Sequence, residues 1–300
     1  MAGRTFELTP KKLAIGMVMT ASGAVLWGIN GTVSKLLMES YSVDPMWVAC
    51  VRQIIAGMLY FAFAAITTPK LLTGMLRERK NYPMLVAVAI ICVLVIQVGY
   101  LQAIHWTNSG TATVLQNFSL LFVLAYVCIR GRRLPTFVEA IGVTCAAIGI
   151  VLISTGGDLS SLSLPLPGLV WGLASAFGNA AMAIMPIELI ARWGAFSVNG
   201  VSFLISGFVL LPFVQPWSHM PQLDMRGWLM LAFLAVVGTF MACGLFMAGV
   251  SIIGSMRGSL IGAIEPVIAT ITAVLWTGSV FSTAELVGLV LIVIMIILVR

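Results

Sequence analysis

Ten apolar runs of close to 20 residues follow one another along this chain, joined by short polar connections. A run of that length lets a helix cross the ~30 Å hydrocarbon core of a bilayer. Because lipid offers no water to backbone polar groups, and because no alternating strands of ~10 residues occur, we expect every span to be a helix. The predicted spans are 13–38, 46–67, 83–104, 110–129, 137–154, 168–190, 198–214, 227–249, 256–276 and 283–299.

The composition agrees with a membrane protein. Only 9% of the residues are charged, and the mean hydropathy is +1.09. Soluble domains carry about 25% charged residues. Lipid is therefore the solvent for most of this chain, and we expect an all-α integral membrane protein.

The second half of the chain repeats the first. The matches are 21–57 with 171–207 at an offset of 150, 103–127 with 248–272 at an offset of 145, and Gly142 with Gly288 after a slip of one residue. Each copy holds five predicted spans, and an odd number makes the second copy enter the bilayer from the opposite side. Inverted repeats of this kind form a substrate site between two halves that move against each other. We predict two inverted five-helix repeats, residues 1–155 and 166–300.

Lysine and arginine gather at alternate ends of the spans. With the N-terminus inside, thirteen of the sixteen lie at cytoplasmic ends: Arg4, Lys11, Lys12, Lys70, Arg77, Arg79, Lys80, Arg130, Arg132, Arg133, Arg192, Arg257 and Arg300. The outer loops hold only Arg226. Basic residues favour cytoplasmic loops, so both termini are expected in the cytoplasm. The net charge of +6 is then an orientation signal, and we expect no nucleic acid as a partner.

Several short motifs occur in a characteristic order. They are Trp27-Gly28 and Lys35 in the first span, Arg52 early in the second, the stretches 103–113 and 248–259, Glu265-Pro266-Val267, and Gly142 and Gly288. As an ordered set they resemble the drug/metabolite transporter superfamily, specifically its ten-helix EamA-type permeases, over essentially the whole chain. The resemblance implies export or exchange of small metabolites, often amino acids, across a bacterial inner membrane, without an ATP site.

The chain also departs from that family pattern. Many members carry a Gly-Glu pair after the fourth and ninth helices, where this chain has Gly131-Arg132 and Gly278-Ser279. The first half has Leu121 at the position that matches Pro266. A substrate known for a better-matched member is therefore not transferred to this chain.

Glu265 is the most informative single residue, because it lies near the middle of the ninth span. A carboxylate there costs about 2.5–3.5 kcal/mol on insertion scales. Pro266 has no N–H and displaces the carbonyl of Gly262. Glu265 is therefore a candidate to bind a cationic group or a proton in a cavity, with Pro266 and Gly262 as hinge candidates. The alternative is a purely structural pairing with a neighbouring helix or base.

Lys35 and Arg52 are the candidate basic partners. Neither is repeated in the second half, where Met185 and Ser202 occupy the matching positions. Substrate recognition need not obey the repeat, so both side chains are candidates to attract an anionic group. In the alternative interpretation they reach the outer interface or pair with nearby acids.

Polar and aromatic residues form stripes at helical spacing on several spans. The candidates for the wall of a polar cavity are Trp27, Asn30, Gln97, Tyr100, Gln116, Asn117, Trp171, Ser175 and Asn179. The seventh span adds Asn199, Ser202 and Ser206. Some of these side chains are expected to face a solute, and others to form interhelical hydrogen bonds worth ~0.6 kcal/mol each.

Helix-breaking residues suggest where the halves move. Gly28 and Gly31 soften the first span, and Pro186 frees the Met182 carbonyl in the sixth. Interruptions at matching places of two repeats mark moving parts in transporters. These three residues complete the set of hinge candidates, although glycine and proline are also simply frequent in membrane helices.

Together these features predict a secondary transporter that exports or exchanges small polar or amphipathic metabolites by alternating access. An importer or exporter of amines or drugs in the same fold, and a non-transporting scaffold, are the alternatives. An intramembrane enzyme would need a paired catalytic acid or a metal set, and Glu265 alone supplies neither.

The expected partners are a small-molecule substrate and the lipid bilayer, with protons as a candidate coupling ion. The five cysteines lie scattered in apolar stretches without a CxxC pair, so no metal is expected. We also expect no other cofactor, and a monomer or weak homodimer.

Overall fold

The computed structural model describes residues 10–158 and 163–299, and every regular element within them is a helix. Nine helices, or runs of consecutive helices, in this part of the chain are long and apolar enough to cross a membrane. One further apolar helix, α16 (Thr283–Leu298), has 16 residues. The chain is a multi-pass helical membrane protein. Arg4 and Arg300, two of the basic residues behind the predicted orientation, lie outside the described residues.

The first half follows the predicted order of spans. Its elements are α1 (Pro10–Ser40), α2 (Pro45–Thr67), the short α3 (Pro69–Arg77), η1 (Arg79–Asn81), α4 (Tyr82–Ala87), η2 (Val88–Leu94), α5 (Val95–Trp106), α6 (Ser109–Gln116), α7 (Ser119–Arg130) and α8 (Phe137–Thr155). The consecutive elements from η1 to α5 form one span, and α6 with α7 forms the next.

The second half has the same arrangement. Its elements are α9 (Leu166–Ile184), the short α10 (Ile187–Trp193), α11 (Ala195–Val214), α12 (Met225–Ala232), η3 (Phe233–Met241), α13 (Ala242–Ile253), α14 (Ser255–Gly262), α15 (Ile264–Thr277) and α16. Both η2 and η3 are π-helical. They begin 145 residues apart, at the offset that relates the two halves in this region of the sequence.

Three of the predicted spans are interrupted. Two of the breaks lie beside helix breakers named from the sequence, and the break in the fourth span was not predicted. The span at 110–129 breaks at Asn117–Phe118, the span at 168–190 at Met185–Pro186, and the span at 256–276 at Ala263. The break at Pro186 follows from the missing N–H and the ring clash four residues back. The helix α1 runs through Gly28 and Gly31 without interruption.

The breaks in the fourth and ninth spans correspond to each other, although only the ninth contains a proline. In the fourth span, Asn117 Nδ2 donates to the Thr113 carbonyl at 2.8 Å. Three-residue turns follow, in which Leu120 N donates to Asn117 O at 3.2 Å and Leu121 N to Phe118 O at 2.9 Å. A side chain that satisfies a freed carbonyl lets a helix break inside a membrane without proline.

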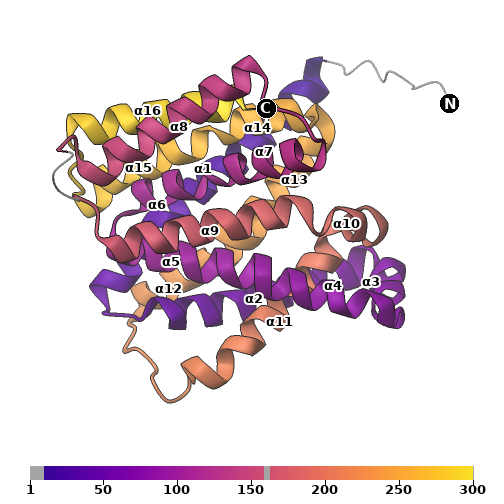
Figure 1. Ribbon diagram of the computed structural model, residues 1–300. Coiled ribbons are helices and arrows are strands. Elements are labelled where there is room, and N and C mark those ends of the chain that lie inside the picture. The colour runs from indigo at the N-terminus through magenta and orange to yellow at the C-terminus, as the bar shows by residue number, and fades with distance from the viewer. Residues whose placement is uncertain (1–9, 159–162, 300) are drawn as a thin grey trace.

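Each main helix pair joins one span of the first half to one span of the second, and the pairs follow the symmetry of the repeat. The second span packs on the seventh (α2 on α11) and the fifth on the tenth (α8 on α16). The first span packs on the eighth (α1 on α13), and its counterpart is the third on the sixth (α5 on α9). In Figure 1 the α8–α16 pair lies at the top and the α2–α11 pair at the bottom, with the other spans between them.

Glycines permit the close approach within the symmetric pairs. A Cβ on Gly57 of α2 would lie 2.8 Å from the Leu204 amide nitrogen of α11, and a Cβ on Gly207 would lie 2.6 Å from Ile54 Cγ1. These two contacts are each other's equivalents at the offset of 150. Small residues at such positions let helix backbones come close in lipid, where van der Waals packing drives association.

Polar caps fix where the helices begin. Thr136 with Glu139 forms a capping box at the start of α8, and Ser282 with Glu285 forms another at the start of α16. These boxes occupy matching places in the two halves. Each box satisfies two orphan backbone donors, and this S/T-x-x-E signature can be read directly from the sequence.

Candidate functional site

A central cavity of about 250 Å³ lies between the two halves. Eight spans contribute to its wall, and the α8–α16 pair does not. The lining residues are Trp27, Asn30, Arg52, Tyr60, Val93, Ile96, Gln97, Tyr100, Gln116, Asn179, Met182, Asn199, Phe203, Gly238, Thr239, Cys243 and Glu265. Nine of the residues proposed from the sequence lie in this wall: Trp27, Asn30, Arg52, Gln97, Tyr100, Gln116, Asn179, Asn199 and Glu265.

Arg52 brings a buried positive charge to the cavity. Its side chain is 2% exposed, and Nη2 donates a hydrogen bond to Gln97 Oε1. Nε and Nη1 have no hydrogen-bond partner among the described residues. Burial of a guanidinium whose donors lack partners costs desolvation free energy. An anionic ligand group that accepts hydrogen bonds from these donors would offset that cost.

Glu265 brings a carboxylate to the same cavity. It stands in the first turn of α15, directly after the break at Ala263. The partial positive charge at a helix N-terminus stabilises an acidic side chain there, which offsets part of the insertion cost. Among the described residues, Glu265 forms no ion pair and no hydrogen bond. The carboxylate is therefore available to a ligand.

Tyr100 brings a hydroxyl group to the same cavity. This hydroxyl shares a 2.8 Å hydrogen bond with Thr113 Oγ1. Gly31 of α1 provides the space, because a Cβ there would lie 2.5 Å from the Tyr100 hydroxyl oxygen. The cavity thus combines a cation, an anion and a neutral hydroxyl.

Gly28 of α1 makes a second close approach, to the broken ninth span. A Cβ on Gly28 would lie 2.8 Å from the Glu265 carbonyl oxygen. Thr32, one turn further on, shares hydrogen bonds with Ser109 Oγ at 2.8 Å and with Thr272 Oγ1 at 2.6 Å. The glycines proposed as hinges therefore lie where α1 contacts α15 and α5, and their role in motion stays a prediction.

Six of the sequence candidates lie outside the cavity wall. Two of them, Ser202 and Ser206, are buried on α11, where Ser206 Oγ donates to Gln53 Oε1. Ser175 accepts a 2.7 Å hydrogen bond from Gln116 Nε2, and Asn117 caps the break in its own span. The Trp171 side chain is exposed on α9 and does not line the cavity. Lys35 forms an ion pair with Glu39 at 3.1 Å and donates to the His105 carbonyl at 3.0 Å. Of the two candidate bases, Arg52 alone is in the wall.

An aromatic cluster forms another part of the wall, and most of it was not among the candidates. The Tyr60 ring lies 5.5 Å from Phe203 and 5.1 Å from Phe240, and its hydroxyl donates to the Thr239 carbonyl at 2.9 Å. That carbonyl belongs to the π-helical η3, where the ordinary helical bonding is altered. A tyrosine in the middle of an apolar span is the sequence signal that could have identified Tyr60.

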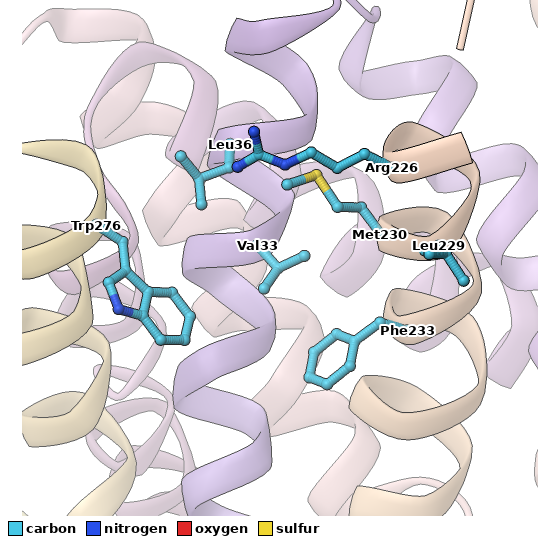
Figure 2. Close-up of a pocket in the computed structure, with 7 residues that line it drawn as sticks. All are labelled: Val33, Leu36, Arg226, Leu229, Met230, Phe233 and Trp276. Carbon is cyan, nitrogen blue, oxygen red and sulfur yellow. The ribbon is translucent and has the colours of Figure 1, made fainter. Parts of the chain in front are cut away.

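A second hollow lies apart from this cavity and has a different character. A groove of about 520 Å³ lies between α1, α12 with η3, and α15. Figure 2 shows the side chains that line it. Trp276 projects toward it from α15, and Arg226 extends from α12 toward Leu36. The other lining side chains are apolar, and the groove contains none of the candidate residues. The polar central cavity is therefore the candidate solute site.

Several proteins are similar to this chain along its whole length. A Salmonella typhimurium protein named as an uncharacterized inner membrane transporter, YicL, is 31% identical over 95% of this chain and 94% of its own length. The Escherichia coli protein YedA, also named as an uncharacterized inner membrane transporter, is 24% identical over 92% of this chain and 87% of its own length.

A solved structure supports the fold. A crystal structure with 16% sequence identity superposes with a TM-score of 0.64, covering 93% of this chain and 94% of that chain. The sequence profile of the EamA-like transporter family matches residues 14–155 and again residues 166–300. With that double match and relatives named as membrane transporters, the chain belongs to the EamA-like transporter family.

Proposed function

We propose that this protein is a secondary transporter that binds a small zwitterionic or amphipathic metabolite, such as an amino acid or a related compound, in the central cavity. The observation that carries this proposal is the pair of unmatched charges in one wall. Arg52 has two guanidinium nitrogens without a partner, and Glu265 forms no ion pair among the described residues. An amino acid carries one group for each.

The transport mechanism proposed is alternating access between two inverted five-helix repeats, residues 1–155 and 166–300, with ten spans in total. Helix pairs that exchange with the halves, matching π-helical segments and matching capping boxes support this assignment. A site at the interface of inverted repeats is open to one side of the membrane at a time when the repeats rock.

The proposed setting is a bacterial inner membrane with both termini in the cytoplasm. The distribution of lysine and arginine supports this orientation, and the names of the Salmonella and Escherichia relatives support the location. The proposed direction is outward, by export or exchange. Protons are the proposed coupling ion, with Glu265 as the group that binds them, and the proposed assembly is a monomer or weak homodimer.

A second candidate function is transport of amines or drugs in the same fold. The aromatic part of the wall favours it, since Trp27 and Tyr60 line a cavity that also contains Glu265. Attraction between a cation and an aromatic face reaches about 2 kcal/mol when both are desolvated. A ligand of this class would not need Arg52.

A thermal-unfolding experiment with three matched compounds separates these candidates. Leucine carries both charges, 3-methylbutylamine lacks the carboxylate, and 4-methylpentanoate lacks the amine. A ligand at 100 times its dissociation constant adds about 2.7 kcal/mol to the stability of the folded state. The experiment is repeated with a panel of other amino acids, each with its matched amine and carboxylate. We expect leucine or another amino acid to raise the unfolding temperature, and its two single-charge analogues to have little effect.

The same measurements can also contradict the proposed function. Stabilisation by amines alone would favour the second candidate, and counterflow in proteoliposomes with the stabilising compound would then test transport. A panel of amino acids, amines and drugs that neither stabilises the protein nor moves across the vesicle membrane would refute both functions.

A further inference from the structure

Among the contacts that join the first half of the chain to the second are two hydrogen bonds between exposed side chains, and these two lie at opposite ends of the spans. Tyr41 Oη donates to Asp224 Oδ1 at 2.5 Å. Arg192 Nη2 donates to Glu78 Oε1 at 2.6 Å, and of the four ion pairs among the described residues only this one crosses between the halves. In Figure 1 the helices α3 and α10, beside the second contact, lie on the right, and the start of α12 lies on the left.

The two contacts occupy equivalent positions in the repeat. Tyr41 follows the first span of the first half, and Asp224 is the N-cap of α12, which opens the third span of the second half. Arg192 lies in α10, after the first span of the second half, and Glu78 is the N-cap of η1, which opens the third span of the first half. The sequence offset of 150 places Arg192 opposite Ser42, next to Tyr41.

The spans that these contacts hold together are the ones that enclose the cavity. The first contact joins α1 to the span of η3, which contribute Asn30 and Gly238 to the wall. The second joins α9 to the span of η2 and α5, which contribute Asn179 and Gln97. Separation of either pair at its end of the membrane would open a route to the solute site.

We propose that Tyr41–Asp224 and Glu78–Arg192 are two latches that each keep one entrance of the central cavity closed and that open in alternation. This inference rests on the transport function proposed above. The four residues are positioning residues, because they lie outside the cavity wall and act on it through the spans that they join. Throughout the cycle one latch stays formed while the other separates.

The strength of the contacts suits a switch. In the Glu78–Arg192 latch the side chains are 31% and 49% exposed, and an exposed ion pair changes an equilibrium by about one- to fivefold. Tyr41–Asp224 is likewise an exposed contact. A latch of this strength biases two conformations whose free energies differ little, and it can be broken in each cycle.

The two latches differ in chemistry, so they respond to different conditions. Two cations lie beside Glu78: Lys80 Nζ is 3.3 Å from Glu78 Oε2, and Arg192 Nη2 is 2.6 Å from Glu78 Oε1. The Arg192 guanidinium also lies 4.7 Å from the centre of the Trp193 ring. At the other end, Asp224 accepts from Tyr41 and also caps α12 through the Gly227 amide at 2.8 Å. Salt screens exposed ion pairs, so it weakens the charged latch more than the hydrogen-bonded one.

Cys243 provides a native reporter, because its side chain lines the central cavity. A membrane-impermeant maleimide is applied to each face of vesicles, and labelling of the Cys243→Ser variant is subtracted. We expect Glu78→Gln to raise Cys243 labelling from the face where Glu78 lies by about two- to fivefold, and Tyr41→Phe to raise labelling from the opposite face. High salt should reproduce the effect of Glu78→Gln but not that of Tyr41→Phe.

Control variants separate a latch from a general loss of structure. Glu188→Gln removes an exposed carboxylate from the same region, on α10, and should leave labelling unchanged. The exchange of charges in Glu78→Arg with Arg192→Glu should restore the parental pattern. The proposal would be overturned if neither Glu78→Gln nor Tyr41→Phe raised Cys243 labelling from one face more than from the other. It would also be overturned if Cys243 stayed unlabelled in every variant.

The reporter experiment needs no transported solute, so it separates the latches from the transport function. Face-specific labelling in a protein that moves no compound would leave the latches standing and refute the transporter. Transport by a protein whose labelling ignores both latch variants would refute the latches alone.

Discussion

Gly57 of α2 lies so close to Leu204 of α11 that a Cβ on the glycine would be 2.8 Å from the leucine amide nitrogen. Backbone cannot move aside as a side chain can, so Gly57→Ala must push the two helices apart. We expect it to destabilise the protein by about 1–3 kcal/mol, the usual effect of overpacking. Unfolding by heat or denaturant in detergent measures this change.

The equivalent glycine supplies the control. At Gly207 the nearest atom is Ile54 Cγ1, at 2.6 Å, and the Ile54 amide nitrogen is at 3.2 Å. Ile54→Ala should therefore recover part of the stability lost in Gly207→Ala, whereas Leu204→Ala should recover less in Gly57→Ala. Equal recovery in the two pairs would contradict a backbone clash at Gly57.

Arg52→Gln tests the anion-binding half of the proposed site. The substitution removes the positive charge, and a hydrogen bond to a charged group contributes about 1.5–3 kcal/mol. We expect affinity for the stabilising amino acid to fall about 10- to 100-fold, measured by titration calorimetry. Lys35→Gln is the matched control, since that cation pairs with Glu39 outside the cavity. A larger loss in Lys35→Gln than in Arg52→Gln would contradict the assignment.

The sequence predicted the helical class, the order of the spans and nine residues of the cavity wall, because helical periodicity places polar stripes on one face. It did not separate cavity residues from structural ones. Gln116 lines the cavity and Ser175 accepts its hydrogen bond, yet both are polar residues at helical spacing. Only the relative rotation of α6 and α9 distinguishes them, and that rotation depends on packing between distant segments.

Lys35 and Arg52 illustrate the same limit. Both are single bases in neighbouring spans, and neither is repeated in the second half. Glu39 stands four residues after Lys35, so a local ion pair competes for that lysine. Arg52 has no acidic neighbour at that spacing and remains directed at Gln97 on another span. Acidic residues at a spacing of four therefore carry information that the repeat comparison did not use.

Pro266→Ala tests what causes the break in the ninth span. The fourth span breaks at the equivalent place with Leu121 where the second half has Pro266. We therefore expect the break at Ala263 to persist in Pro266→Ala, because α1 packs on it through Gly28. Hydrogen exchange over residues 260–270 should show an unprotected amide at position 266. A protected amide and a continuous helix would identify the proline as the cause.

Glu265→Gln tests proton coupling. Glutamine keeps the shape of the side chain but cannot bind and release a proton as the carboxyl group does. Transport should therefore fall, and its dependence on pH should flatten. Uptake into proteoliposomes at several pH values measures both effects, with Glu188→Gln on the exposed face of α10 as the control. An unchanged rate and pH profile in Glu265→Gln would refute the proton role and also the assignment of Glu265 as the partner of the substrate's ammonium group.

Tyr41→Phe should change the titration of Asp224 in a defined direction. The hydrogen bond from Tyr41 is the largest of the effects that hold the pKa of Asp224 below its ordinary value of 3.8, followed by the backbone amide of Gly227. A lowered pKa means that this contact contributes above pH 3.8 and is lost as the pH falls through the folded-state value. The contact should therefore be constant between pH 5 and 8, and Tyr41→Phe should raise the pKa of Asp224. Carbon-13 NMR of labelled aspartate can measure this pKa, because the chain has only three aspartates. An Asp224 titration identical in the parent protein and in Tyr41→Phe would show that the Tyr41 hydroxyl does not reach the carboxylate.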